Sequence, residues 1–228
     1  MFIISEKQLR DFDLTNAKQF VQYWGKPYSY ASVKDYNTKK NIDYIEELNL
    51  GNSLSGQNIK LLLRWKDPRM LTEKILSGPN EGKDNLKVLR VLDKRNSINR
   101  FRKGDMGAEE FETTTEKIFP NGFVWQIFLF HIARPFEFPI ADRNVFHTFS
   151  IHKKTITPRD WKGYKNYIDY FFQIAISAGS VTQRPKGNEP DLKEIVKRLK
   201  YVDNSLVTFG QFLNSYGEKK HYPKALNK

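Results

Sequence analysis

The sequence predicts an all-α protein, built as one large domain or as two helical lobes that share a cleft. Its length of 228 residues suits either arrangement. Apolar residues recur at the i, i+3, i+4 and i+7 positions of an amphipathic helix in most segments. Strictly alternating apolar and polar stretches, which would indicate strands, are nearly absent. Gly- and Pro-containing stretches separate the periodic segments and predict loops.

The first half of the chain carries this helical period in several short segments. Pro68 is expected to end the helix predicted over 55–65, because proline lacks the N–H that a helix interior requires. A loop is predicted over 77–84, which is rich in Gly and Pro, and a basic loop over 100–107. The expected helices are 14–24, 41–50, 55–65, 85–100 and 109–117.

The second half of the chain is more apolar and more aromatic. The run 123–132 predicts a buried core helix, and an amphipathic segment starts at Asp142. An aromatic helix is predicted over 158–178, with Thr157 as its cap and Pro158 in its first turn. Gly179 is its expected stop. Two further helices are expected over 191–201 and 204–216.

The composition is strongly basic and lacks cysteine. Lys and Arg total 38 against 26 Asp and Glu, a net charge of +12 at pH 7. This excess favours a polyanionic partner such as nucleic acid over a basic surface that serves only solubility. The absence of Cys excludes disulfides, thiolate catalysis and cysteine-based zinc sites. The four His show no metal-binding spacing, so neither a metal nor another cofactor is expected.

No signal peptide or membrane-spanning run is apparent in the sequence. The apolar residues at the start of the chain form too short a run for a secretory signal. No uninterrupted apolar stretch approaches the roughly 20 residues that a membrane span needs. A cytoplasmic protein without a membrane partner is expected, associated with the nucleoid if bacterial.

The segment 118–149 holds the residues that suggest chemistry. Its turn Phe119-Pro120-Asn121-Gly122 leads into the apolar run, and the lone acid Asp142 follows one helix and one loop later. The first N–H groups of a helix lack internal partners, so such a turn can hold a phosphate. The alternative roles are an ordinary helix–helix turn and a helix N-cap. An apolar setting would let the carboxylate stabilise positive charge or activate water.

This segment resembles the core signature of the helix-hairpin-helix DNA glycosylase superfamily, the endonuclease III-like fold. The shared pattern is a Pro- and Gly-containing hairpin, an apolar helix and a Phe-Pro-Ile stretch that ends in Asp142 at the next helix start. The usual hairpin is Leu-Pro-Gly-Val-Gly, whereas Gly122 is the single glycine here. In bifunctional members a Lys lies two residues after the last hairpin glycine, and Val124 occupies that position in this chain.

The resemblance implies a DNA N-glycosylase without lyase activity, acting on duplex DNA with a damaged or modified base. The flipped base would enter a pocket while Asp142 stabilises the oxocarbenium-like sugar. It also implies a second lobe formed from 1–100 and part of 157–216 within a single unit, 1–228. The implied DNA contacts are Pro120, Asn121, Gly122, Phe123, Arg143, Lys153 and Lys154, and the expected base-pocket residues are Tyr28, Tyr30 and Trp125.

Three alternatives remain open from the residues alone. One is a DNA-binding protein that uses the hairpin as a sequence-tolerant grip and has no catalytic activity. Another is an interaction scaffold whose basic surface serves an acidic protein partner. A third keeps the glycosylase chemistry but directs it at modified foreign DNA, such as that of a virus. The excised base is not specified by any residue in the sequence.

Overall fold

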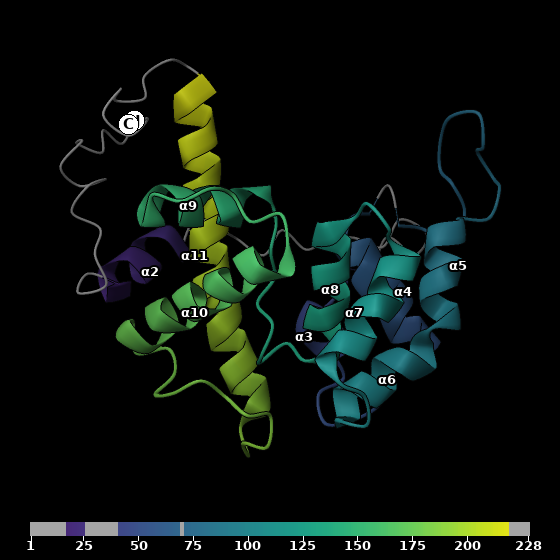
Figure 1. Ribbon diagram of the computed structural model, residues 1–228, viewed down its shortest axis with the longest axis horizontal. Helices are drawn as coiled ribbons and strands as arrows, with labels where there is room; N and C mark the ends of the chain where they lie inside the picture. The colour runs from purple at the N-terminus through teal and green to yellow at the C-terminus, as the bar shows by residue number, and fades with distance from the viewer. Residues whose placement is uncertain (1–16, 26–40, 69–70, 219–228) are drawn as a thin grey trace. The chain divides into compact units, whose positions relative to one another are not determined.

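The computed structural model describes residues 17–25, 41–68 and 71–218, and regular structure within these ranges is helical (Figure 1). The isolated bridge between Lys74 and Asp84 closes the loop between them and extends into no strand. An all-α fold is therefore confirmed for the described part of the chain. None of the described helices is long and apolar enough to cross a membrane.

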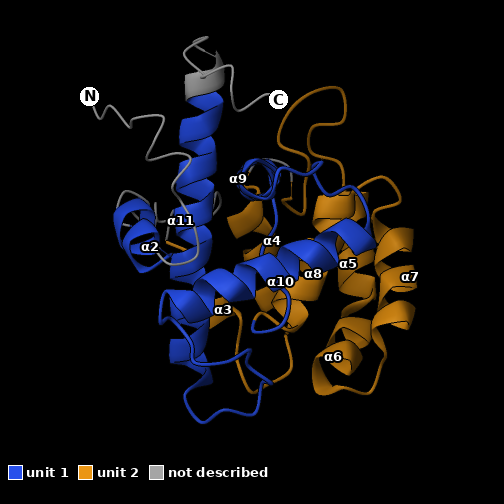
Figure 2. Cartoon of the chain, turned by 60° about the vertical axis from the view of Figure 1, so that its left-hand side comes forward, with its two compact units in different colours: residues 1–29, 136–228 blue, residues 30–135 orange. Residues whose placement is uncertain are grey.

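The chain divides into two compact units (Figure 2). Unit 1 comprises residues 1–29 and 136–228, and unit 2 comprises residues 30–135. The division falls inside the 118–149 segment, between Pro135 and Phe136. Residues 30–100 cluster with residues 101–135 in unit 2.

Unit 1 is organised around its longest helix. Helix α11 (Leu192–Glu218) packs along α2 (Ala17–Gly25) and α9 (Arg143–Lys153), and α10 (Trp161–Ser177) contacts all three. Aromatic rings fill the contact between α2 and α11, where the ring centroids of Phe20 and Phe209 lie 5.3 Å apart. Gly210 allows the backbone of α11 to approach α9 closely, because a Cβ there would lie 2.1 Å from the carbonyl oxygen of Asn144.

Unit 2 is built from shorter helices around a buried one. Helix α8 (Phe123–Ala133) is buried from Gln126 to its end and packs against α6 (Arg95–Lys103) and α7 (Ala108–Ile118). The remaining helices α3 (Tyr44–Glu47), α4 (Gly56–Lys66) and α5 (Leu86–Asp93) complete this unit. The buried run expected over 123–132 is thus confirmed as a core helix.

A half-buried arginine, Arg102, forms hydrogen bonds to several chain segments of unit 2. Arg102 donates to the carbonyl oxygens of Leu48 at 2.7 Å, Asn49 at 2.8 Å and Ile132 at 2.9 Å. Burial lowers the pKa of Arg102 to about 10, which leaves it charged at neutral pH. The basic loop expected over 100–107 was wrong for residues 100–103, because α6 continues to Lys103. Arg102 is hydrogen-bonded to backbone carbonyls within the unit.

Several helix boundaries differ from the sequence-based expectation, and the helix expected over 41–50 spans only Tyr44–Glu47. The predicted helix 85–100 is divided at Lys94, whose N–H bonds to carbonyls of the preceding turn while α6 begins at the next residue. The aromatic helix begins at Trp161, because the Asp160 carboxylate rather than Thr157 caps it by accepting from the N–H of Gly163 at 2.7 Å. The two helices expected over 191–216 form the single helix α11.

Candidate functional site

Asp142 is the N-cap of α9. Its Oδ1 accepts hydrogen bonds from the N–H groups of Asn144 at 2.7 Å and Val145 at 3.0 Å. Within the part of the chain that the structure describes, Oδ2 accepts no hydrogen bond. The side chain is half-buried, next to the buried Ile140 and Ala141. One oxygen therefore fixes the helix start, and the other remains available for a further partner.

Two buried tyrosines of α10 hold the segment that leads to Asp142. Tyr164 donates its hydroxyl to the carbonyl oxygen of Pro139 at 2.7 Å, and Tyr167 donates to that of Ile140 at 3.2 Å. Burial raises the pKa of both hydroxyls well above their ordinary value, and the negative charge of Asp203 acts in the same direction. Both tyrosines therefore stay protonated and keep donating at neutral pH.

A chain of polar side chains links α9 to α11 one turn beyond Asp142. The amide nitrogen of Asn214 donates to the Asn144 side-chain oxygen at 2.9 Å. The Asn214 side-chain oxygen lies 2.5 Å from Nδ1 of His147, which is half-buried. This arrangement fixes the His147 ring and leaves its Nε2 without a hydrogen bond among the described residues.

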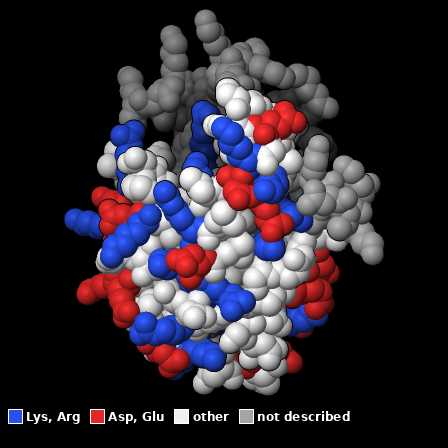
Figure 3. All heavy atoms as spheres, turned by 90° about the vertical axis from the view of Figure 1, so that its right-hand side faces the viewer, with Lys and Arg blue, Asp and Glu red and all other residues white. Residues whose placement is uncertain are grey.

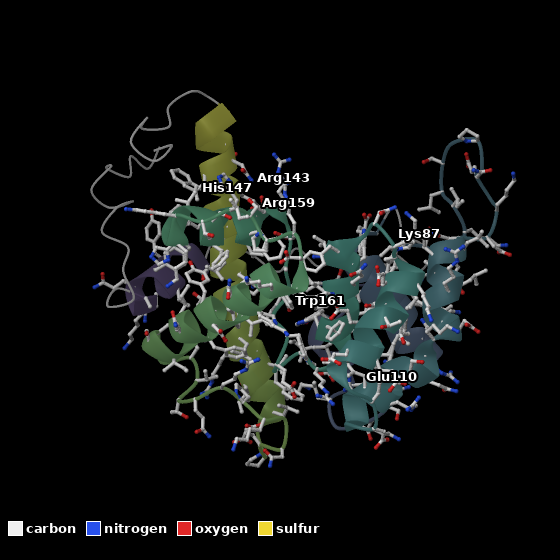
Figure 4. All side chains as sticks on the ribbon, in the orientation of Figure 1. Lys87, Glu110, Arg143, His147, Arg159 and Trp161 are labelled. Carbon is white, nitrogen blue, oxygen red and sulfur yellow. The ribbon has the colours of Figure 1, made fainter. Side chains whose placement is uncertain are left out.

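The predicted phosphate contacts of unit 1 lie at both ends of α9. Arg143 is exposed in the first turn, next to Asp142, and Figure 4 shows it at the same end of unit 1 as Arg159. Lys153 and Lys154 lie at the other end of the helix, about 16 Å away at the usual rise per residue. The Lys153 ammonium lies 5.6 Å from the Tyr170 ring centroid, and Lys154 ends the helix in a left-handed conformation.

The sequence-predicted hairpin is a turn that joins α7 to α8 within unit 2. The Gly122 N–H donates to the Phe119 carbonyl at 3.0 Å, and the Gln126 side chain donates to the same oxygen at 2.7 Å. The backbone angles of Gly122 are φ −117° and ψ 55°, so the turn does not depend on a left-handed glycine. The exposed turn leaves the N–H groups of Asn121 and Val124 without an acceptor in the described structure.

The hairpin residues belong to unit 2 and Asp142 belongs to unit 1, so the two are described separately. Pro120 and Asn121 are exposed, and Gly122, Phe123 and Trp125 are half-buried. The Trp125 ring stacks on Phe119, with centroids 6.1 Å apart. The other two expected base-pocket residues, Tyr28 and Tyr30, lie outside the described residues.

Some residues near Asp142 were missed by the sequence analysis. The sequence places Tyr164 and Tyr167 in the predicted aromatic helix without indicating a partner for either hydroxyl, and it gives His147 no role beyond the missing metal-binding spacing. Trp161 also belongs to the predicted aromatic helix, and it is half-buried at the start of α10, one turn before Tyr164 (Figure 4). Only the helical spacing of the aromatic residues was visible in the sequence, and it does not indicate which hydroxyl meets which carbonyl.

No known protein family matches this chain, and neither the curated proteins nor the solved structures include a match. Among the described residues, no group of three or more His, Asp and Glu side chains is arranged to hold a metal ion.

Proposed function

We propose that this protein is a DNA glycosylase without lyase activity, which releases a damaged or modified base from duplex DNA. The observation that carries the proposal is the state of the Asp142 carboxylate. Its Oδ1 is held by two backbone N–H groups, whereas Oδ2 has no partner within the described residues and the side chain is half-buried. The position of this acid in a motif that resembles a glycosylase signature, within a chain of net charge +12, supports the assignment.

The proposed reaction is hydrolysis at the sugar carbon C1′. The bond between C1′ and the base nitrogen breaks and leaves positive charge on the sugar, which Oδ2 of Asp142 stabilises at close range. A water oxygen then bonds to C1′, and its proton leaves to the released base. The hydrogen bonds to Asn144 and Val145 prevent rotation of the carboxylate, so no reorientation is required as charge develops.

In this proposal each unit is assigned its own candidate DNA contacts. The N–H groups of Asn121 and Val124 are available to a backbone phosphate at the start of α8. Arg143 adds a flexible cation next to the reacting carboxylate. Lys153 and Lys154, at the other end of α9, are further candidate phosphate contacts.

The main alternative is a DNA-binding protein without catalytic activity. The observation that favours it is the hairpin, where the single glycine uses its own N–H for the Phe119 carbonyl. Such a turn has fewer N–H groups to offer to phosphate than a hairpin with two glycines. The two functions make the same prediction for binding and opposite predictions for base release.

The test is base release from a panel of duplexes that carry different lesions and modified bases, detected as strand cleavage after alkali. The wild-type protein is expected to release at least one base, and Asp142→Asn is expected to reduce that rate by about 100-fold or more. Asparagine keeps an oxygen that accepts from the α9 N–H groups, so DNA affinity should be retained. Strand cleavage without alkali would contradict the absence of lyase activity.

A second substitution distinguishes a loss of catalytic activity from a loss of folding stability. Asp142→Ala removes the cap as well and should lower the free energy of unfolding by about 1 kcal/mol, whereas Asp142→Asn should be nearly neutral. Unchanged base release in Asp142→Asn would remove Asp142 from the mechanism. Binding without release across the whole panel would favour the alternative function.

A further inference from the structure

Unit 2 contains an open cavity of about 660 Å³ along one face of α6. The spacing of its lining residues, i, i+1, i+4, i+5 and i+8, places them on the same side of that helix. The chain just before α4 supplies the facing wall. The volume lies within the range of about 300–1,000 Å³ that is typical of small-ligand sites. The α6 residues that line it are Arg95, Asn96, Asn99, Arg100 and Lys103.

Hydrogen bonds join the two walls of this cavity, which are α6 and the chain just before α4. The Asn99 side-chain oxygen accepts from the Leu54 N–H at 2.7 Å, and its amide nitrogen donates to the Leu54 carbonyl at 3.0 Å. The Leu54 side chain is buried beneath them. One asparagine therefore satisfies both backbone groups of Leu54, and these hydrogen bonds hold the two walls of the cavity together.

The cavity carries uncompensated positive charge. Arg95 and Lys103 are exposed, and neither forms an ion pair or a hydrogen bond within the described residues. Arg100 is engaged, since it lies 3.5 Å from the Glu110 carboxylate and donates to the Asp105 carbonyl at 3.3 Å. The carboxylate of Asp105 also lines the cavity, but it pairs with no cation there.

The start of α4 adds to this positive potential. Ser55 caps the helix by accepting from the N–H of Asn58 at 3.1 Å, and Gly56 is the first helical residue. A Cβ at Gly56 would lie 3.9 Å from Nη1 of Arg95, so the guanidinium sits beside the helix start. A helix N-terminus carries partial positive charge, and a cation next to it is unfavourable unless an anion lies between them.

We infer that this cavity binds a phosphate group carried by a nucleotide. Figure 3, seen from the side on which α5 lies in Figure 1, shows Lys and Arg interspersed with Asp and Glu, so surface charge alone singles out no site. The cavity is distinguished from the rest of this surface by its concave shape, by the cations Arg95 and Lys103, by the amide of Asn96 and by the start of α4. Its volume exceeds that of a bare ion and suits a nucleotide unit, either free or within a nucleic acid strand.

The experiment measures binding of three probes to the full chain: inorganic phosphate, adenosine 5′-monophosphate and a fluorescein-labelled DNA duplex. Amide NMR shifts at Ser53, Ser55 and Asn99 report occupancy of the cavity. Arg95→Gln/Lys103→Gln is expected to weaken binding of the responding probe at least tenfold and to abolish those shifts. If the phosphate belongs to the DNA duplex, the double variant should also release about two fewer counterions on binding, which is measured as a shallower dependence of log K on log salt concentration.

A matched variant controls for net charge. Lys83→Gln/Lys87→Gln removes two exposed cations of the same unit outside the cavity and should leave probe affinity within twofold of wild type. Equal losses in both double variants, or no shift at the cavity with any probe, would overturn the inference. A response to the mononucleotide identifies a free ligand, and a response to the duplex alone identifies a nucleic acid strand. These readouts record binding, so failure of Asp142-dependent base release would not affect them.

Discussion

The hydroxyl of Tyr164 donates a hydrogen bond of 2.7 Å to the carbonyl oxygen of Pro139, three residues before Asp142. The hydroxyl is fully buried, and its partner is buried as well. Tyr167 makes the equivalent contact with Ile140 one helical turn later. The conformation of the segment that presents the candidate carboxylate is therefore set from α10.

Removal of either hydroxyl should affect stability and positioning together. Tyr164→Phe leaves the Pro139 carbonyl buried without its donor, so the free energy of unfolding should fall by about 1–3 kcal/mol. Under the proposed function, kcat for base release should also fall while the DNA dissociation constant stays unchanged. Tyr23→Phe, at a hydroxyl-bearing residue 46% exposed, is the control and should change stability by about 0.5 kcal/mol or less. Full stability in Tyr164→Phe would argue against this contact.

Alkaline pH should destabilise the folded protein through the same tyrosines. Burial raises the pKa of Tyr164, Tyr167 and Tyr170 in the folded state, whereas unfolded tyrosine ionises near pH 10. Above about pH 10 the unfolded chain releases protons that the folded chain retains. The free energy of unfolding should therefore decrease with pH, by up to about 1.4 kcal/mol per pH unit for each tyrosine.

Urea unfolding measured between pH 8 and pH 11 checks this dependence. The stability should be fully present below pH 10 and decline above it. The double variant Tyr164→Phe/Tyr167→Phe should show a shallower decline than wild type, because two of the titrating groups are gone. An identical slope in both proteins would contradict the assignment of the effect to these residues.

Local signals explain why much of the helical fold was predictable. The sequence predicts a helix that begins at Ser55. The structure confirms Ser55 as the N-cap, whose hydroxyl accepts a hydrogen bond from the Asn58 N–H. Asp142 was expected at a helix start and is found there. In both cases the side chain contacts N–H groups two or three residues away, so the information lies within a few positions of sequence.

Features that depend on distant residues were not predictable in this way. No Gly or Pro marks the break at Lys94, and no side chain near 202–203 signals that α11 runs on without interruption. Arg102 appeared to belong to a basic surface loop, yet its acceptors lie 30 to 54 residues away in the sequence. The partners of Tyr164 and Tyr167 are 25 and 27 residues away, respectively. Helical periodicity indicates that such residues are buried but does not identify their partners.

Gly210 should not tolerate a side chain. Alanine favours a helix over glycine by about 1 kcal/mol, which alone would stabilise α11. However, the new Cβ would lie 2.1 Å from the Asn144 carbonyl oxygen and 2.6 Å from its carbon, both backbone atoms. The clash outweighs the propensity, so Gly210→Ala should lower the free energy of unfolding by about 1–3 kcal/mol. In Gly56→Ala the nearest atom is 3.9 Å away, so this control should be neutral or slightly stabilising.

The buried ion pair of Lys200 and Asp203 should cost stability when only one charge is removed. Both side chains are 4% exposed and lie one turn apart on α11. Asp203→Leu leaves the Lys200 ammonium buried without this carboxylate and should reduce the free energy of unfolding by about 3–5 kcal/mol. Lys200→Met should act in the same direction. The double variant Lys200→Met/Asp203→Leu removes both desolvated charges, so it should be more stable than either single variant. A thermodynamic cycle from urea unfolding measures this coupling, and additive losses would mean that the two charges act independently.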